Sequence, residues 1–220
     1  KINLYIYHLK NNIKMVMISP PAPLNSSDYE KCAEVDQQGY GFTSSYDKNP
    51  FISTFGLGPC IALVGYNRKN KIGFIYHIDN KNCFQDRNVG HLYYKISTIK
   101  KKLDIENMMF EVTLFGATTN MRHDFINYIY SQIQKYNVMW KKSHNIEICI
   151  VQNYIGTPNN STSVCLNTKD GSFYSFNGKK SKIFKNKSSL ETELREMSMV
   201  LNSMSENINL TENYFGKIVP

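Results

Sequence analysis

The sequence predicts a single-domain mixed α/β fold, and three observations support this fold class. The chain has 220 residues, which is enough for one substantial domain and short for two. Strand-like runs alternate with runs whose apolar residues recur at helical spacing, and polar turn signals separate them. Aromatic residues are abundant (15 Tyr and 12 Phe), so a packed core can be filled. The expected order of elements is hairpin, helix, strand, helix, strand, hairpin and helix.

The first half of the predicted core begins with a β-hairpin. Its strands are IALVGYNR (61–68) and KIGFIYHID (71–79), and the polar turn NRKNK joins them. A helix is expected over 91–103, because apolar residues recur there every three or four positions. The apolar face of this helix would consist of Leu92, Ile96, Ile99 and Leu103. MMFEVTLFG (108–116) has apolar residues at alternate positions, which predicts a strand that ends at Gly116.

The second half of the predicted core follows the same logic. A helix is expected over 122–137, and its apolar stripe would consist of Phe125, Ile129, Ile133 and Tyr136. NIEICIVQN (145–153) predicts a strand, because isoleucines occupy alternate positions. SVCLNTKDGSFYSFN (163–177) predicts a second hairpin that turns at Asp170-Gly171.

The two ends of the chain differ from this core in their composition. Residues 19–50 carry PPAP, Gly39, Gly41 and Pro50, which predicts an irregular arm or long loop around the domain. Near the other end, Ser188 is followed three residues later by Glu191, which is the pattern of a helix capping box. A final helix is expected after it, with Leu190, Leu194, Met197, Leu201 and Met204 on one side.

The net charge of +8 comes largely from lysines, which cluster at 100–102 and 179–187. We interpret these clusters as solvated surface, because the sequence shows no arginine-rich stripe, no zinc-finger spacing and no paired-aromatic RNA-binding signature. The sequence therefore predicts no nucleic-acid partner. It also predicts no membrane span, since no apolar run approaches the ~18–20 residues that cross a bilayer. Nothing in the pattern indicates an oligomeric state.

The five cysteines predict free thiols in a reducing compartment, such as the cytoplasm. They are Cys32, Cys60, Cys83, Cys149 and Cys165. Their number is odd and no CxxC pair occurs, so neither a disulfide framework nor a zinc site is expected. We expect no metal and no cofactor. Each cysteine is then either a small core residue or a nucleophile.

Cys60 is the best candidate for a nucleophile. The preceding stretch STFGLGP (53–59) contains Gly56 and Gly58, which let the backbone turn sharply and present N–H groups to an oxyanion. Pro59 lacks an N–H, so one such donor is absent, whereas Cys60 keeps its own. Glycines on the approach distinguish Cys60 from Cys149 and Cys165, which have strand neighbours instead.

A thiol nucleophile needs a base, and the predicted hairpin supplies one. Cys60 enters the first strand of the hairpin, while His77 lies near the end of the second. Antiparallel pairing brings these two ends side by side, so His77 is the expected base. Thr54 is a plausible hydroxyl to orient the imidazole, and a backbone carbonyl would also serve. The alternative is that Cys60 is an ordinary core cysteine and His77 an ordinary satisfied histidine.

These residues resemble the motif of the chemotaxis glutamine deamidase (CheD) family. TFGLGPC (54–60), with His77 seventeen residues after the cysteine, is similar to that family's Thr-x-Gly-Leu-Gly-Ser-Cys motif and its following histidine. FEVTLFGATTN (110–120) looks like the family's strand and Phe-Gly-Gly-Ala turn, with Ala117 in place of the second glycine. The resemblance implies Cys60 as nucleophile, His77 as base and Thr54 as the residue that orients His77. Pro59 stands where the family has serine.

The resemblance also implies a fold and a reaction. The implied fold is a mixed α/β sandwich, shared with cytotoxic necrotizing factor-type toxin deamidases, and the likeness covers residues 50–177. Residues 1–49 would form an N-terminal arm or extension, and 178–220 a C-terminal basic loop and helix. The implied reaction is hydrolysis of a Gln or Asn side-chain amide in a protein substrate, with release of ammonia. Toxin-like relatives leave export into another cell as an open alternative to the cytoplasm.

Two other functions remain open at this stage. His77 is followed by Ile78 and Asp79, and this His-x-Asp pattern looks more like protein N-terminal asparagine amidohydrolases. The third alternative is a binding module that retains the fold without the activity, which Pro59 and the missing second glycine suggest.

Overall fold

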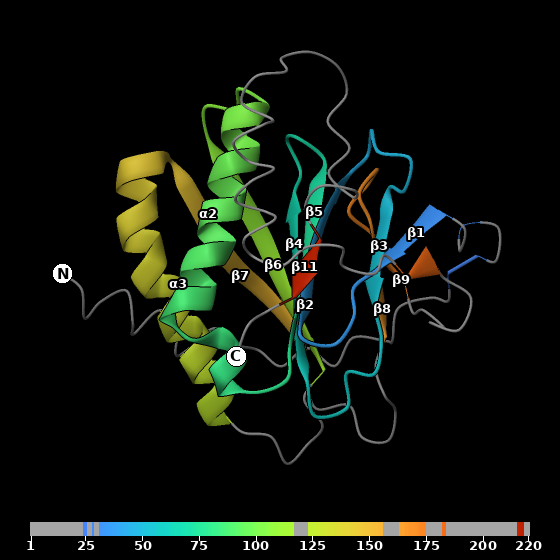
Figure 1. Cartoon of the computed structure of the whole chain (residues 1–220), viewed down its shortest axis with the longest axis horizontal. Helices are drawn as coiled ribbons and strands as arrows, with labels where there is room; N and C mark the ends of the chain where they lie inside the picture. The colour runs from blue at the N-terminus through green and yellow to red at the C-terminus, as the bar shows by residue number, and fades with distance from the viewer. Residues whose placement is uncertain are drawn as a thin grey trace.

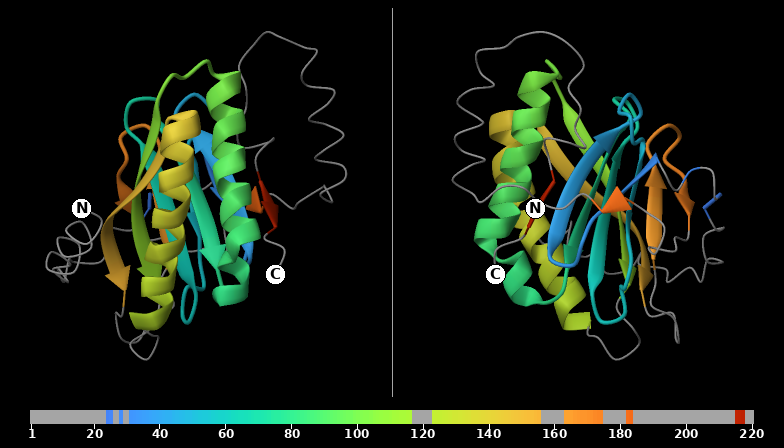
Figure 2. Two further views of the ribbon diagram at one scale, coloured as in Figure 1. Left: turned by 90° about the vertical axis from the view of Figure 1, so that its left-hand side faces the viewer. Right: turned by 45° about the vertical axis from the view of Figure 1, so that its right-hand side comes forward.

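The computed structural model describes residues 24–25, 28, 31–116, 123–155, 163–174, 182–183 and 215–217, and these residues form three layers. Two helices cover one face of a six-stranded sheet, and a smaller five-stranded sheet covers the other face (Figure 1). The same layers are visible edge-on in the right-hand view of Figure 2. The predicted mixed α/β class is therefore confirmed, with two sheets and two α-helices among the described residues.

The six-stranded sheet has the order β11-β2-β5-β4-β6-β7. It is antiparallel except at one edge, where β6 and β7 run parallel. A helix joins those two strands, as a parallel connection requires. Its strands are β2 (Gly39–Ser44), β4 (Ile61–Asn67), β5 (Ile72–Ile78), β6 (Met108–Gly116), β7 (Ile146–Ile155) and β11 (Gly216–Lys217).

The five-stranded sheet has the order β10-β1-β3-β8-β9. β3 and β8 pair antiparallel, and β8 and β9 form the hairpin predicted around Asp170-Gly171. β1 instead runs parallel to β3. The strands of this sheet are β1 (Cys32–Glu34), β3 (Phe51–Thr54), β8 (Val164–Asn167), β9 (Phe173–Tyr174) and β10 (Lys182–Ile183).

The helices are α2 (Asp86–Lys102) and α3 (His123–His144), and a short 3-10 turn, η2 (Lys81–Phe84), precedes α2. The two helices predicted for the core, over 91–103 and 122–137, are confirmed, and each is longer than expected. Their apolar stripes pack on the six-stranded sheet, because that side of each helix alone carries closely spaced apolar residues. Neither helix of the described part combines the length and apolar character that a bilayer crossing would require.

Two apolar cores follow from the alternation of side chains along the central strands. In β4, Ile61 and Leu63 face the helices, whereas Ala62 and Val64 face the smaller sheet. β5 alternates in the same way, with Ile75 in the core between the sheets. A strand with apolar residues on both faces can lie only at the centre of a layered domain. The candidate site lies at the end of this inter-sheet core.

The structure corrects the prediction for residues 19–50. Within this segment, β1 and β2 are regular strands, one in each sheet, rather than an irregular arm. Gly41 does not mark a turn: a Cβ there would lie 2.5 Å from the ring of Phe215, so the glycine permits close packing. β10 and β11, from the segment 178–220, likewise pair with β1 and β2.

Two further differences concern the helices. Leu103 is the C-cap residue of α2 and is 37% exposed, so it does not continue the apolar face as predicted. Its backbone has left the helix, and its side chain therefore no longer follows the helical period. The final helix expected after Ser188 lies outside the described residues.

Candidate active site

The β4–β5 hairpin brings Cys60 and His77 together. Ala62 pairs with His77 and Ile61 with Ile78. Cys60, which directly precedes β4, therefore lies at the open end of the hairpin, where β5 ends. Cys60 and His77 both face the smaller sheet. Cys60 is two residues before Ala62 and His77 is two residues after Ile75, and both of these neighbours face that sheet. The Cys60 Sγ lies within 4.8 Å of a ring nitrogen of His77. Both residues are buried.

Thr54 approaches His77 from the opposite sheet. It is the last residue of β3, and its Oγ1 lies 2.7 Å from His77 Nδ1. The same hydroxyl donates to the backbone carbonyl of Val35 at 2.8 Å. A hydroxyl has one proton, so Thr54 Oγ1 must accept the proton of His77 Nδ1–H. The neutral imidazole is thereby held in the tautomer whose Nε2 has a free lone pair.

Asp79 is the third ionisable group beside Cys60 and His77. Its Oδ1 lies 3.6 Å from His77 Nε2, and its side chain is only 10% exposed. The other oxygen, Oδ2, accepts hydrogen bonds from the side-chain amides of Gln37 and Gln38, each at 2.9 Å. These amides come from the connection between β1 and β2. Asp79 is therefore held with Oδ1 toward Cys60 and His77.

The electrostatics of the group keep Cys60 and His77 neutral at rest. Burial, and secondarily the neighbouring Asp79 carboxylate, raise the pKa of the Cys60 thiol to about 12. Burial lowers the pKa of His77 to about 4, although Asp79 and Asp36 partly oppose this. At neutral pH the pair is thus a thiol beside a neutral imidazole, not a thiolate beside an imidazolium.

The turn before Cys60 combines exposed and buried residues. Leu57 is fully buried and anchors the turn, whereas Phe55 is 48% exposed. Gly56 has φ +75°, a conformation that side chains rarely adopt, so glycine is needed there. Gly58 has open space around its Cβ position and no such φ. The oxyanion role of Gly56, Gly58 and the Cys60 N–H remains a prediction.

Gly116 supports this turn from β6, and sequence reasoning gave it no site role. It has φ +105°, and a Cβ at this position would lie 2.2 Å from the carbonyl oxygen of Cys60. The same Cβ would meet the Leu57 carbonyl oxygen at 3.0 Å. The backbone of Cys60 can therefore occupy its place only because residue 116 has no side chain. The pairing of Gly116 with Ile61 explains this proximity.

Asp79 was also missed as a site residue, although a signal for it exists. Residues 77 and 79 are two apart in an extended segment, so their side chains point to the same side. The Gln37 and Gln38 contacts carry no such signal, because they depend on how the β1–β2 connection crosses the hairpin end. The remaining cysteines are free thiols as expected, and the Sγ atoms of Cys32 and Cys165 lie 3.7 Å apart in the smaller sheet.

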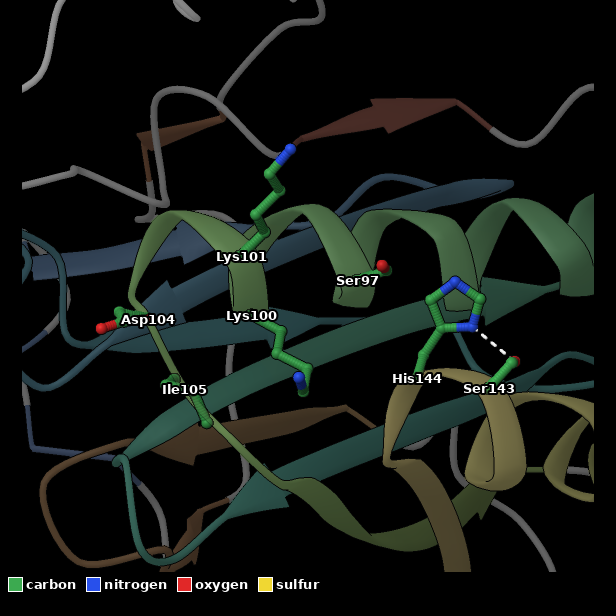
Figure 3. Close-up of a pocket in the computed structure, with 7 residues that line it drawn as sticks. All are labelled: Ser97, Lys100, Lys101, Asp104, Ile105, Ser143 and His144. Atoms are coloured by element: carbon green, nitrogen blue, oxygen red, sulfur yellow. Dashed lines mark hydrogen bonds between the residues drawn. The ribbon is translucent and has the colours of Figure 1, made fainter.

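A separate surface pocket of about 360 Å³ lies between the C-terminal ends of α2 and α3 (Figure 3). In Figure 3, Lys101 and Asp104 point away from His144, whose Nδ1 is 2.6 Å from Ser143 Oγ. The polar groups of this pocket do not converge on one point, and it shares no residue with the Cys60 group. It is lined by Ser97, Lys100, Lys101, Asp104, Ile105, Ser143 and His144.

Comparisons with known proteins relate the chain to a viral protein but to no family. No protein-family description matches the chain. The uncharacterized protein R721 of Acanthamoeba polyphaga mimivirus is 25% identical over 187 residues, which is 76% of this chain. The matched region covers 64% of the length of the viral protein, so this chain spans less than two thirds of its relative. The name of this relative states no activity.

Proposed function

We propose that this protein is a cysteine-dependent amidase that hydrolyses the side-chain amide of a Gln or Asn residue in a protein substrate. The observation that supports this best is the Thr54–His77–Cys60 arrangement, which supplies an oriented base beside a thiol. The layers of helices and two sheets are compatible with the fold of chemotaxis glutamine deamidases, and we propose this fold for the chain. The proposed reaction needs no cofactor.

The first half of the reaction forms a thioester. His77 Nε2 takes the proton of the Cys60 thiol as Sγ adds to the carboxamide carbon, because this nitrogen has the free lone pair. The carbonyl oxygen becomes an oxyanion, for which the backbone around Cys60 is the proposed donor. The tetrahedral intermediate then collapses: the C–N bond breaks, and ammonia leaves with the proton that His77 held.

The second half regenerates the thiol. Water adds to the thioester carbon while His77 Nε2 accepts one of its protons. The C–S bond breaks, the substrate is released as a carboxylic acid, and His77 returns the proton to Cys60 Sγ. Because Cys60 is protonated at rest, the thiolate forms only as attack occurs. The base must therefore be correctly oriented beforehand, and the Thr54 hydrogen bond fulfils that requirement.

The substrate would approach over the turn that precedes Cys60. Cys60 itself is only 3% exposed, so a long, narrow side chain must reach it from the surface. Phe55 and Pro59 are exposed on this turn and are the proposed contacts for the substrate backbone. An extended Gln or Asn side chain can reach Cys60 in this way, whereas a backbone peptide bond inside a folded protein cannot.

Asp79 favours a second candidate, an N-terminal asparagine amidohydrolase. Its Oδ1 is buried and, apart from the neighbouring Cys60 thiol, has no hydrogen-bond partner among the described residues. A carboxylate oxygen in that state is suited to a cation such as the free α-ammonium group of a substrate. Peptides with a free N-terminal Asn, compared with their acetylated forms, separate this activity from internal deamidation. Deamidation of the peptide with the free N-terminus alone would favour the second candidate.

The decisive experiment is a search for deamidated partners by mass spectrometry. Candidate proteins incubated with the wild-type chain should gain about 1 Da per modified site, as expected when an amide becomes an acid in covalent catalysis. Cys60→Ala should abolish the gain. Cys149→Ala is the matched control, because it removes a free thiol from β7, away from Cys60.

The proposal fails if the wild type and Cys60→Ala modify an identified partner equally. Binding of a partner without any mass gain or ammonia release would instead support a binding module on the same fold.

A further inference from the structure

We propose that Cys60, His77 and Asp79 together form a binding site for a thiophilic divalent cation, with Zn²⁺ as the best-suited ion. One sulfur, one imidazole nitrogen and one carboxylate oxygen from these residues lie within 4.8 Å of one another. The nitrogen and the oxygen are 3.6 Å apart. Bonds of about 2.0–2.3 Å to a tetrahedral Zn²⁺ place ligand atoms roughly 3.3–3.7 Å from each other. The observed group is therefore close to a ligand set.

Two of the ligand atoms are buried and have no protein partner outside this group of three residues. His77 Nε2 and Asp79 Oδ1 are both inaccessible to solvent, and apart from the Cys60 thiol beside Asp79 neither has a hydrogen-bond partner within the described part of the chain. Such atoms are costly in a protein interior unless a ligand or water satisfies them. Because both belong to the same small group, a single cation bound between them would satisfy both.

The surrounding hydrogen bonds already orient the ligands as an outer shell does. Metal-bound histidines donate their second ring N–H to a neighbouring acceptor, which fixes the coordinating nitrogen. Here His77 Nδ1–H donates to Thr54 Oγ1, which leaves Nε2 for the metal. Gln37 and Gln38 hold Asp79 Oδ2 in the same way and leave Oδ1 free.

The charges of the group also suit a divalent cation. Without a cation, a Cys60 thiolate would stand beside the Asp79 carboxylate, and these two negative charges repel each other. A divalent cation reverses this relation: with a thiolate, a carboxylate and a neutral imidazole as ligands, the complex has no net charge. Binding must release the thiol proton, so affinity should rise with pH.

The ligand types select the metal. A thiolate and an imidazole favour Zn²⁺ or Co²⁺ over Mg²⁺ and Ca²⁺, which prefer oxygen ligands alone. Three protein ligands leave the fourth position of a tetrahedral ion open. A water molecule or a small anion would occupy that position.

Metal binding would compete with the thiol chemistry, and this consequence rests on the proposed function. The cation would occupy the Cys60 sulfur and the His77 Nε2 lone pair, which are the two atoms that attack requires. Free Zn²⁺ would then be a reversible inhibitor of the amidase. The binding itself requires only the three side chains.

The test uses the full chain, freed of metal with a chelator and then dialysed. Titration calorimetry with Zn²⁺ should show one ion per chain. Co²⁺ should produce a sulfur-to-metal charge-transfer band, which identifies the thiolate as a ligand. Cys60→Ser should remove the band. Cys60→Ser and Asp79→Asn should each weaken Zn²⁺ binding by more than the roughly tenfold that loss of an outer-shell partner alone can cost, because each removes a ligand. Cys149→Ser, the matched control, should bind like the wild type.

Circular dichroism of each variant shows whether it is folded. Protection by Zn²⁺ of the wild-type thiols from alkylation provides a further measurement that needs no substitution. Zn²⁺ should protect Cys60, but not Cys149, from alkylation, as measured by peptide mass spectrometry. The inference is overturned if the wild type binds no stoichiometric Zn²⁺, or if folded Cys60→Ser and Asp79→Asn bind it unchanged.

The same preparations separate this inference from the proposed function. Deamidation by the chelated wild type that Zn²⁺ suppresses supports both. Stoichiometric Zn²⁺ binding by a chain that never deamidates a substrate supports the metal site and contradicts the amidase. Deamidation that is indifferent to Zn²⁺, in a chain that binds none, contradicts the metal site alone.

Discussion

Thr54 and His77 belong to different sheets, yet Thr54 Oγ1 lies 2.7 Å from His77 Nδ1 in the core between them. The Thr54 hydroxyl donates its only proton to the Val35 carbonyl, so it can interact with His77 only as a hydrogen-bond acceptor. One hydrogen-bond chain therefore connects Val35, the residue that follows β1, with β3 and β5, and it determines which imidazole nitrogen faces Cys60. The packing of the two sheets and the state of the base are coupled through this contact.

Thr54→Val should impair both activity and stability. Valine has a similar shape but no hydroxyl, so His77 Nδ1–H and the Val35 carbonyl lose their partner. A buried polar group left without a partner costs about 1–3 kcal/mol. With the tautomer no longer fixed, the deamidation rate should fall by about tenfold to a hundredfold, which is a part of the roughly hundredfold to ten-thousandfold that a positioned base contributes. Rate measurements and urea unfolding test both effects.

Thr54→Ser is the matched control for this substitution, because it keeps the hydroxyl. It should retain most of the rate. If Thr54→Val keeps the wild-type rate on a verified substrate, the hydroxyl does not position the base.

Asp79→Asn should make the Cys60 thiol more reactive in the absence of substrate. Asp79 contributes to the raised pKa of Cys60, which is about 12, so removing its charge should lower that pKa. A larger thiolate fraction at a given pH means faster alkylation. The alkylation rate of Cys60 as a function of pH, followed by mass spectrometry, should shift to lower pH. Cys149 in the same samples serves as the internal reference, and an unchanged Cys60 profile would contradict this account.

The sequence predicted the hairpin but not everything that surrounds it. Alternating apolar residues and a polar turn were sufficient to place Cys60 beside His77, because hairpin pairing is local. Asp79 required only the two-residue period of the strand to be applied once more. Gln38 and Gly116 could not be found in this way. Their contacts depend on how distant segments cross the end of the hairpin, and the period within one segment carries no information on that crossing.

The same limit explains the misjudged N-terminal segment. The glycines and polar residues in 19–50 are typical of loops, so the composition did not predict β1 and β2. Position 41 has no room for a side chain, because the ring of Phe215, more than 170 positions later in the chain, packs against it. Local propensity cannot distinguish a glycine that turns the chain from one that accommodates a distant ring.

Glu34 should make the free energy of unfolding depend on pH. It is 1% exposed in β1, and burial, with Asp36 nearby, raises the pKa of its carboxyl from 4.5 to about 7. A carboxyl whose pKa is higher in the folded state binds more protons there, so its contribution to stability falls as pH rises through this window. Glu34→Gln should remove that contribution.

The Glu34 effect is best measured as the difference between Glu34→Gln and the wild type. His77 has a lowered pKa of about 4, so it acts in the opposite sense and favours the unfolded state as pH falls. Both chains contain His77, so subtraction cancels it. In urea unfolding, the stability of Glu34→Gln relative to the wild type should increase between pH about 4.5 and about 7. A constant difference across this range would show that Glu34 does not titrate with a raised pKa.

Gly116→Ala should disrupt the candidate site from outside the motif. The new Cβ would lie 2.2 Å from the Cys60 carbonyl oxygen, and φ of +105° is itself unfavourable for alanine. Backbone strain of this kind costs about 1–3 kcal/mol, and the clash adds to it unless the Cys60 turn moves. We expect lower stability in urea unfolding and a loss of deamidation, because Cys60 would shift relative to His77. Gly58→Ala is the matched control from the motif itself: its Cβ position is open, so the fold should tolerate the extra methyl group. If Gly58→Ala proved the more destabilising of the two, the close approach of β6 to the Cys60 backbone would not be what holds the turn in place.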